Sequence, residues 1–306
     1  MSAIRALLPF DRGTADGVVL PLGADAGFYD GTGPVPGNLS AVEFFVPPHP
    51  PRAESVKLIG AMPRLRVVQT LSVGVDHLTG HLPAGVVLCN GRGLHESSTA
   101  ELAVGLIIAA QRNLPYFIDA QNRGEWLYEM GEGLAGRTVI VVGHGGIGRG
   151  IERRLTAFDA RVMFVARTAR PPVLGAESLM SMLPRADVVV LAVPLTPQTT
   201  HLADRGFLRQ MRDGALLVNV SRGAVVDTGA LVSETCSGRL RAALDVVEPE
   251  PLPAGHPLWT SPGVIITPHV GAASSAFLAP AWRLICDQLA RYLAGIELRN
   301  QVTDLY

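Results

Sequence analysis

Residues 138–148 read Thr-Val-Ile-Val-Val-Gly-His-Gly-Gly-Ile-Gly, and this stretch decides the fold. A five-residue apolar strand runs into a G-x-G-x-x-G turn, and a helix over residues 147–158 follows directly. The first glycine permits the tight turn, the second admits a pyrophosphate, and the third lets the helix pack on the strand. A glycine-rich turn alone is weak evidence, but this context predicts a dinucleotide site built from Gly143, Gly145, Gly146, Ile147 and Gly148.

Apolar runs of strand length alternate with helical segments beyond this turn. The predicted strands cover residues 161–166, 187–192, 215–220, 240–244 and 264–267, and the helices between them include 204–211 and 227–237. Near-continuous apolar strands separated by helices are typical of a parallel sheet that is covered on both faces. We therefore predict an α/β fold with a doubly wound parallel sheet. Upstream, the clearest elements are strands at 67–71 and 86–89 and a long helix at 98–113.

Composition sets further bounds. The 306 residues suffice for two domains, and 48% hydrophobic with 17% charged residues describes a globular protein. A net charge of −1 gives no general attraction to nucleic acid or to an anionic membrane, so we expect neither as a partner. The three cysteines form no disulfide framework or zinc spacing, and we predict no metal site. No apolar run approaches the roughly 20 residues of a membrane span, and we expect a cytoplasmic protein.

The end of the second strand of this sheet indicates which dinucleotide binds. An NAD site usually carries an acid there for the ribose 2′-hydroxyl, whereas this chain has Arg167, Thr168 and Arg170. Two guanidinium groups and a hydroxyl can instead bind a 2′-phosphate. We therefore predict a preference for NADP(H), with NAD possible. The alternative is that both arginines are solvated loop residues beside a permissive NAD site.

A polar residue follows each of the last three predicted strands. Arg222 follows 215–220, Glu250 follows 240–244 and His269 follows 264–267. The arginine can grip a carboxylate and polarise a carbonyl, and the histidine can donate a proton. A hydrogen bond from Glu250 would orient the imidazole; Glu248 is the competing carboxylate. Asp245, at the end of its strand, either orients a nicotinamide amide or closes the strand end.

With these residues in view, the chain resembles the D-isomer-specific 2-hydroxyacid dehydrogenase family, and is most similar to its NADPH-linked glyoxylate/hydroxypyruvate reductases. Besides the glycine turn, the matching motifs are Ser72-x-Gly74-x-Asp76, Pro194-Leu195-Thr196, Asn219-Val220-Ser221-Arg222-Gly223, Asp245-Val246-x-x-x-Glu250-Pro251 and Pro268-His269-x-Gly271. The resemblance implies two Rossmann-like domains. Residues 1–95 plus 273–306 would form the substrate domain, and residues 96–272 the dinucleotide-binding domain.

The resemblance also implies roles for individual residues. The amides of Val73 and Gly74 would hold the substrate carboxylate together with Arg222. Pro194, Thr196 and Asp245 would contact the cofactor. Such an oxidoreductase reduces small 2-oxo acids to D-2-hydroxy acids with NADPH, with His269 as the proton donor. The family's dimeric habit and the aromatic residues within 111–136 predict a homodimer.

Residues 274–277 and Glu250 bear on which substrate is expected, and one alternative function from another class stays open. Related hydroxypyruvate reductases often have an arginine shortly after the histidine, where this chain has Ser274-Ser275-Ala276-Phe277. Glu250 disfavours formate as the substrate, whereas relatives that oxidise phosphite share all three residues. A nucleotide-sensing, corepressor-like binding protein is the alternative from another class, since such proteins also retain the three residues.

Overall fold

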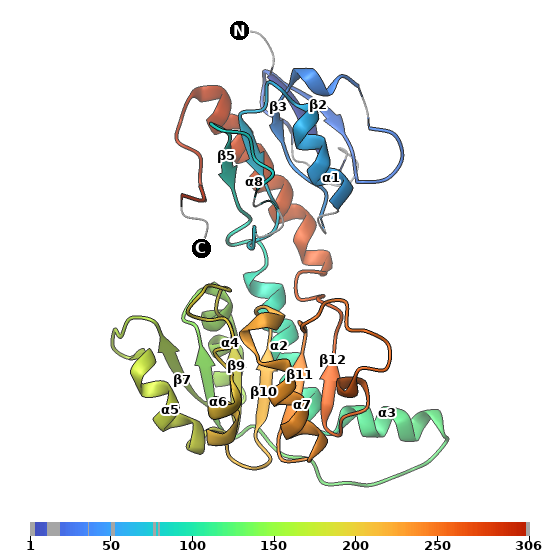
Figure 1. Ribbon diagram of the computed structural model, residues 1–306, viewed down its shortest axis with the longest axis vertical. Coiled ribbons are helices and arrows are strands. Elements are labelled where there is room, and N and C mark those ends of the chain that lie inside the picture. The colour runs from blue at the N-terminus through green and yellow to red at the C-terminus, as the bar shows by residue number, and fades with distance from the viewer. Residues whose placement is uncertain are drawn as a thin grey trace. The chain divides into compact units, whose positions relative to one another are not determined.

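The computed structural model describes residues 4–10, 19–35, 37–49, 53–75, 78 and 80–303, so Asp76 of the first motif lies outside the described residues. The chain divides into two compact units (Figure 1). One unit contains residues 96–274, and the other combines the chain up to residue 95 with the chain from residue 275. No helix among the described residues is both long and apolar enough to cross a membrane.

The unit formed by residues 96–274 contains a seven-stranded parallel sheet. Its strands are β6 (Thr138–Val142), β7 (Arg161–Ala166), β8 (Leu174–Gly175), β9 (Val188–Leu191), β10 (Leu216–Asn219), β11 (Arg241–Leu244) and β12 (Val264–Ile266). They lie in the order β12-β11-β10-β9-β6-β7-β8, so the order of winding reverses between β6 and β9. The predicted doubly wound parallel sheet is confirmed. The short strand β8 was not predicted because two residues carry no periodicity.

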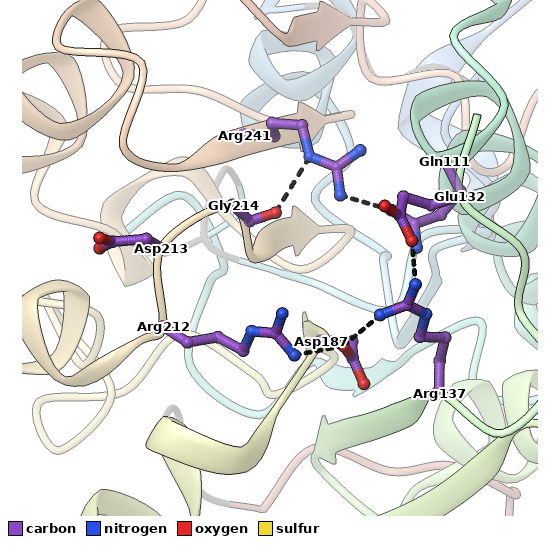
Figure 2. Close-up of a pocket in the computed structure, with 8 residues that line it drawn as sticks. All are labelled: Gln111, Glu132, Arg137, Asp187, Arg212, Asp213, Gly214 and Arg241. Carbon is purple, nitrogen blue, oxygen red and sulfur yellow. Dashed lines mark hydrogen bonds and ion pairs between the residues drawn. The ribbon is translucent and has the colours of Figure 1, made fainter. Parts of the chain in front are cut away.

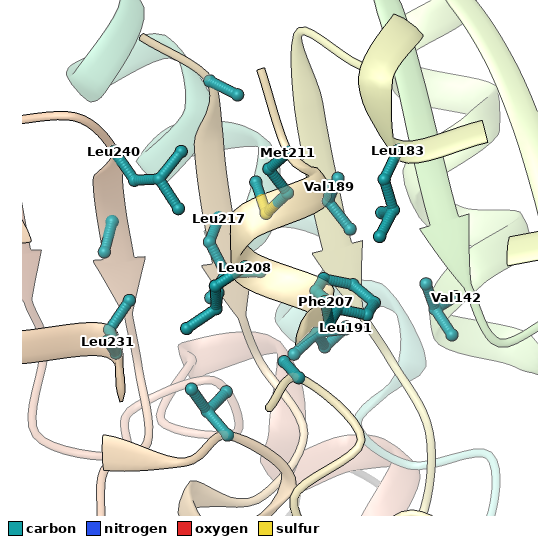
Figure 3. Packing of buried hydrophobic residues seen from close by; sticks show 14 of the residues in the cluster. Val142, Leu183, Val189, Leu191, Phe207, Leu208, Met211, Leu217, Leu231 and Leu240 are labelled. Atoms are coloured by element: carbon teal, nitrogen blue, oxygen red, sulfur yellow. The ribbon is translucent and has the colours of Figure 1, made fainter. Parts of the chain in front are cut away.

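Alternate residues of each strand face opposite layers of the core. On β6, Ile140 and Val142 belong to the cluster that also contains Phe207 and Leu231, from α6 (Arg205–Gln210) and α7 (Thr228–Cys236); Figure 3 shows this cluster. Val139 and Val141 face the other layer, which is formed by α2 (Glu96–Gln111) and α4 (Gly146–Thr156). Each fully buried valine, leucine or phenylalanine contributes about 1.5–3 kcal/mol. Burial on both faces therefore explains the uninterrupted apolar strands.

The helices α2 and α4 approach closely through glycines of α4. A Cβ atom at Gly150 would lie 2.8 Å from the Cβ of Ala100, and one at Gly146 would lie within 2.0 Å of the Glu96 carboxylate oxygens. A side chain at Gly150 would push against Ala100 of α2, and one at Gly146 would displace the Glu96 carboxylate. The close approach fixes the start of α4, and with it the glycine turn, against the long helix.

The second unit has a five-stranded parallel sheet of its own. Its strands are β1 (Ile4–Leu8), β2 (Ala24–Phe28), β3 (Val42–Phe45), β4 (Val67–Gln69) and β5 (Val87–Cys89), in the order β2-β1-β3-β4-β5. One face packs on α8 (Leu278–Ala294), which follows the 3₁₀ turn η9 (Ser275–Phe277). The short helix α1 (Ala53–Lys57) and the 3₁₀ turn η3 (Leu58–Ala61) cover the other face.

A buried pair of glutamines attaches the C-terminal helix to this sheet. Gln288 Nε2 on α8 donates to Gln69 Oε1 on β4 at 2.7 Å, and both side chains are fully buried. Gln288 also donates to the carbonyl of Arg299 and accepts from its amide, each at 2.9 Å. Because an unsatisfied buried polar group costs about 1–3 kcal/mol, these paired amides specify how the chain's last segment returns to the first.

Candidate active site

The carboxyl ends of β10, β11 and β12 lie side by side at one edge of the larger sheet. Arg222 follows β10, Asp245 and Glu250 follow β11, and His269 follows β12. Ligands of doubly wound sheets bind beyond this edge. The strand pairing therefore brings an arginine, two carboxylates and a histidine to the edge where chemistry is expected.

His269 and Glu250 are in direct contact. The imidazole Nδ1 lies 2.7 Å from Glu250 Oε1, whereas Glu248 lies 3.8 Å from the Nε2 of His201. Because an ionised carboxylate only accepts hydrogen bonds, Nδ1 carries the proton of this bond and Nε2 is left for a substrate. The two side chains are 45% and 41% exposed, so the pair contributes at most about 1 kcal/mol to folding. Its consequence is orientation of the ring.

Asp245 holds the loop that carries His269. This aspartate is only 3% exposed, and its Oδ1 accepts hydrogen bonds from Thr267 Oγ1 at 2.7 Å and from the amide of Val270 at 2.9 Å. Its Oδ2 accepts from the amide of Gly271 at 2.9 Å. These three bonds span both sides of His269, whose φ of 53° lies in the left-handed region. Strain of about 1–3 kcal/mol at such a residue persists only where the surroundings impose it.

The turn that carries Arg222 is shaped by a buried asparagine. Asn219 Oδ1 accepts from the amide and the hydroxyl of Ser221, at 3.0 and 2.7 Å, and its Nδ2 donates to the Arg222 carbonyl at 2.9 Å. A Cβ at Gly223 would lie 1.9 Å from the carbonyl oxygen of Val247, so only glycine fits. Arg222 Nη1 donates to the Ser221 carbonyl at 2.8 Å. The motif around Arg222 thus fixes its backbone against the loop that follows β11.

The glycine turn has the geometry that a dinucleotide needs. Gly143 has φ 114°, and a Cβ there would lie 2.3 Å from the carbonyl oxygen of Ala192. A Cβ at Gly148 would lie 2.2 Å from the carbonyl oxygen of Gly143, whereas one at Gly145 would meet nothing within 4 Å. Helix α4 starts without a side-chain cap, so its first amides suit a phosphate. Gly146 and Ile147 are the first residues of that helix.

The turn after β9 borders the same reversal of strand order. Thr199 Oγ1 donates to the carbonyl of Pro194 at 2.6 Å and accepts from the amide of Thr196 at 2.8 Å. Because β6 and β9 are neighbours, this turn and the glycine turn flank the point where dinucleotides bind in such sheets. Thr199 had no role in the sequence prediction, since only the fold reveals that it closes the turn.

The end of β7 presents Arg167, Thr168 and Arg170, all exposed. Arg170 Nη2 lies 3.1 Å from Nδ1 of His144 in the glycine turn. Burial and the positive charges of Arg170 and Arg149 lower the pKa of His144. The described residues of this strand end include no carboxylate, so the acid that usually binds the ribose 2′-hydroxyl in an NAD site is absent here.

In the smaller unit, the loop after β4 offers two backbone amides. Asn90 Nδ2 donates to the Val73 carbonyl at 3.2 Å, and Thr70 Oγ1 accepts from the Ser72 amide at 3.1 Å. Neither Val73 N nor Gly74 N donates a hydrogen bond to another described residue. Two successive amides that are available in this way can bind an anion.

Three aromatic rings pack together beside this loop, and no sequence pattern predicted this cluster. The rings of His49, His95 and Phe277 have centroids 4.9–5.1 Å apart. His49 Nδ1 lies 3.4 Å from Ser72 Oγ, and His95 Nε2 donates to the Leu71 carbonyl at 2.6 Å. Burial lowers the pKa of His95, which favours the neutral ring. The three residues are too far apart in sequence for any local pattern to join them.

A cavity of about 330 Å³ lies at the opposite, amino edge of the larger sheet (Figure 2). It is lined by Gln111, Glu132, Arg137, Asp187, Arg212, Asp213, Gly214 and Arg241. Asp187 accepts from Arg137 at 3.1 Å and from Arg212 at 2.7 Å, and Arg241 donates to Gln111 Oε1 at 2.6 Å. These bonds join the starts of the strands to the end of α2. The side chains that line the cavity therefore bond to one another and stabilise the fold, and they lie away from the edge that carries His269.

The chain is similar to known 2-hydroxyacid dehydrogenases. Residues 104–271 match the family model of the D-isomer specific 2-hydroxyacid dehydrogenase, NAD binding domain. The glyoxylate reductase/hydroxypyruvate reductase of Mus musculus is 39% identical over 238 residues, which cover 73% of this chain and 72% of that one.

Solved structures extend the similarity to nearly the whole chain. An NADPH-dependent glyoxylate/hydroxypyruvate reductase from Sinorhizobium meliloti, in complex with NADP and malonate, has a TM-score of 0.79 and 26% identity, covering 99% of this chain and 98% of its own. A D-isomer specific 2-hydroxyacid dehydrogenase from Xanthobacter autotrophicus, in complex with NADPH and MES, has a TM-score of 0.77 and 28% identity, with the same coverage.

The role of Asp245 in holding the His269 loop can be tested by stability. Asp245→Asn replaces one accepting oxygen by an NH₂ group that faces a donor, so the free energy of unfolding should fall by about 1–3 kcal/mol. Asp213→Asn, at a side chain that is 86% exposed, is the matched control and should change it by less than about 0.5 kcal/mol. Urea denaturation measures both. Equal stability of the two variants would show that Asp245 does not hold the loop.

Proposed function

This chain belongs to the D-isomer-specific 2-hydroxyacid dehydrogenase family, whose members are nicotinamide-dependent oxidoreductases, and we propose that it reduces small 2-oxo acids to D-2-hydroxy acids with NADPH. The single observation that carries the proposal is the hydrogen bond between His269 and Glu250 at the carboxyl edge of a dinucleotide-binding sheet. The unit of residues 96–274 would bind the cofactor, and the other unit would contribute the acid's carboxylate site.

His269 is the proposed proton donor. When bound, the nicotinamide cofactor would supply the hydride that reduces the carbonyl group of the acid, and the carbonyl oxygen would then need a proton. With Nδ1 committed to Glu250, only Nε2 of His269 can deliver the proton to that oxygen. The nearby carboxylate stabilises the imidazolium before transfer, and in the oxidative direction the same nitrogen removes the proton.

Arg222 and the loop after β4 are the proposed acid-binding groups. The guanidinium of Arg222 can pair with the carboxylate and also stabilise charge on the carbonyl oxygen. The amides of Val73 and Gly74, which donate to no other described residue, also suit a carboxylate. A fork of fixed donors favours planar 2-oxo acids over neutral carbonyl compounds.

The residues after β7 support NADPH over NADH. Arg167, Thr168 and Arg170 present two positive charges and a hydroxyl where an NAD site would have an acid. Both similar solved structures described above were crystallised with NADP or NADPH. For the acid itself, residues 274–277 lack a charged group for a polar tail, which favours glyoxylate-like substrates over hydroxypyruvate.

We propose a homodimer that forms through the segment after α2. The helix α3 (Leu114–Asn122) and the residues that follow it expose Trp126, Tyr128 and Met130, with exposed fractions of 101%, 87% and 81%. Large aromatic side chains are enriched at interfaces, where they become buried. Sedimentation velocity should show a dimer, and Trp126→Glu with Tyr128→Glu should produce monomers; a monomeric wild type would refute the proposal.

Turnover is the direct test of the proposed reaction. The purified protein should oxidise NADPH in the presence of glyoxylate or another small 2-oxo acid. Glu250→Gln should lower kcat by roughly 10- to 100-fold, because the amide no longer stabilises the imidazolium. The matched control, Glu248→Gln, should retain the wild-type rate, since Glu248 lies near His201 instead. Tight NADPH binding without turnover of any acid in a panel would favour a nucleotide-sensing protein.

Cofactor preference can be reversed at the end of β7. Arg167→Asp places a carboxylate where the 2′-phosphate would bind, so the ratio of kcat/KM for NADPH to that for NADH should fall by roughly 10- to 100-fold. Arg161→Asp, an exposed site at the other end of the same strand, is the control and should leave the ratio unchanged. A ratio of one before and after the Arg167 change would contradict the assignment.

A further inference from the structure

His144 occupies the first x position of the G-x-G-x-x-G turn, and it contacts the segment that follows the neighbouring strand β7. Its Nδ1 lies 3.1 Å from Nη2 of Arg170. A guanidinium only donates hydrogen bonds, so Nδ1 must be the accepting nitrogen and the ring proton must lie on Nε2. In this contact His144 is therefore a neutral acceptor with a defined tautomer.

The surroundings of His144 maintain that neutral form. Its ring packs edge-on against Phe164 of β7, with centroids 4.4 Å apart and planes at 70°. Burial is the largest cause of the lowered pKa of His144; the charges of Arg170 and Arg149 act in the same direction, and Glu152 opposes them. The contact with Phe164 thus holds the imidazole in place, and the lowered pKa favours its neutral form.

Arg170 is consequently held at both ends. Its amide donates to the carbonyl of Val173 at 3.0 Å, and the amide of Val173 donates back at 2.7 Å, which fixes the backbone. His144 fixes the guanidinium of an otherwise exposed side chain. Arg167, three residues earlier, has no comparable side-chain partner among the described residues. The two arginines therefore differ in how much order they have before a ligand arrives.

We propose that His144 is a positioning residue for NADP recognition, which holds the Arg170 guanidinium beside the glycine turn, ready to pair with the ribose 2′-phosphate. This inference rests on the proposed preference for NADPH. A long side chain that is already ordered loses less conformational freedom when it binds. Loss of the His144 contact should therefore weaken NADP binding by roughly 3- to 10-fold and leave NAD binding unchanged.

Calorimetric titration of the purified protein with NADP and with NAD tests this without relying on turnover. His144→Leu should raise Kd for NADP by roughly 3- to 10-fold but not Kd for NAD. His144→Asn should recover most of the loss, because its Oδ1 can accept from Arg170. Arg170→Met should weaken NADP binding more, and His144→Leu should have no further effect in that background.

Four results would overturn the inference. Equal weakening of NADP and NAD by His144→Leu would make His144 a structural part of the turn. An unchanged Kd for NADP, or an effect that persists in the Arg170→Met background, would show that His144 does not act through Arg170. Equal affinity of the wild type for NADP and NAD would overturn the cofactor proposal and this inference with it, whereas the other results would overturn this inference alone.

Discussion

The in-register parallel pairing of β10, β11 and β12 is the constraint on which the rest of the structure depends. It ends three strands at one edge, so residues separated by tens of positions in sequence emerge as neighbours. Asp245 adds the second half of the constraint, because its buried carboxylate accepts three hydrogen bonds from the loop around His269. Without the pairing the groups would not meet, and without Asp245 the loop that carries His269 would lose three hydrogen bonds.

The two edges of the larger sheet use charge differently. At the amino edge, Asp187 forms ion pairs with two arginines and Arg241 donates to the end of α2, so these charged groups bond to other parts of the protein. At the carboxyl edge, His269 has one nitrogen engaged by Glu250, and the start of α4 has no side-chain cap. Groups that hold the fold together therefore lie at one end of the strands, and groups that can meet a ligand lie at the other.

Periodicity and glycine spacing predicted the larger sheet well, because buried strands between helices leave a strong apolar signal in sequence. Strands β1, β2 and β3 were not predicted, because they are short and lie in a Pro- and Gly-rich segment without a regular alternation of apolar strands and helices. The strand ends together with the family's motif spacing predicted the contact of His269 with Glu250, whereas they did not predict the hydrogen bonds of Asp245. Those bonds depend on how the 267–271 loop folds back over β11, and the ring stack of His49, His95 and Phe277 likewise depends on tertiary packing.

The central claim is that His269 delivers the proton in a hydride transfer to a 2-oxo acid. Stopped-flow measurement of a single turnover of NADPH with glyoxylate tests this most directly. We expect His269→Ala to slow NADPH oxidation by at least roughly 100-fold while the cofactor still binds, and added imidazole to restore part of the rate. Oxidation by His269→Ala at the wild-type rate would contradict the account.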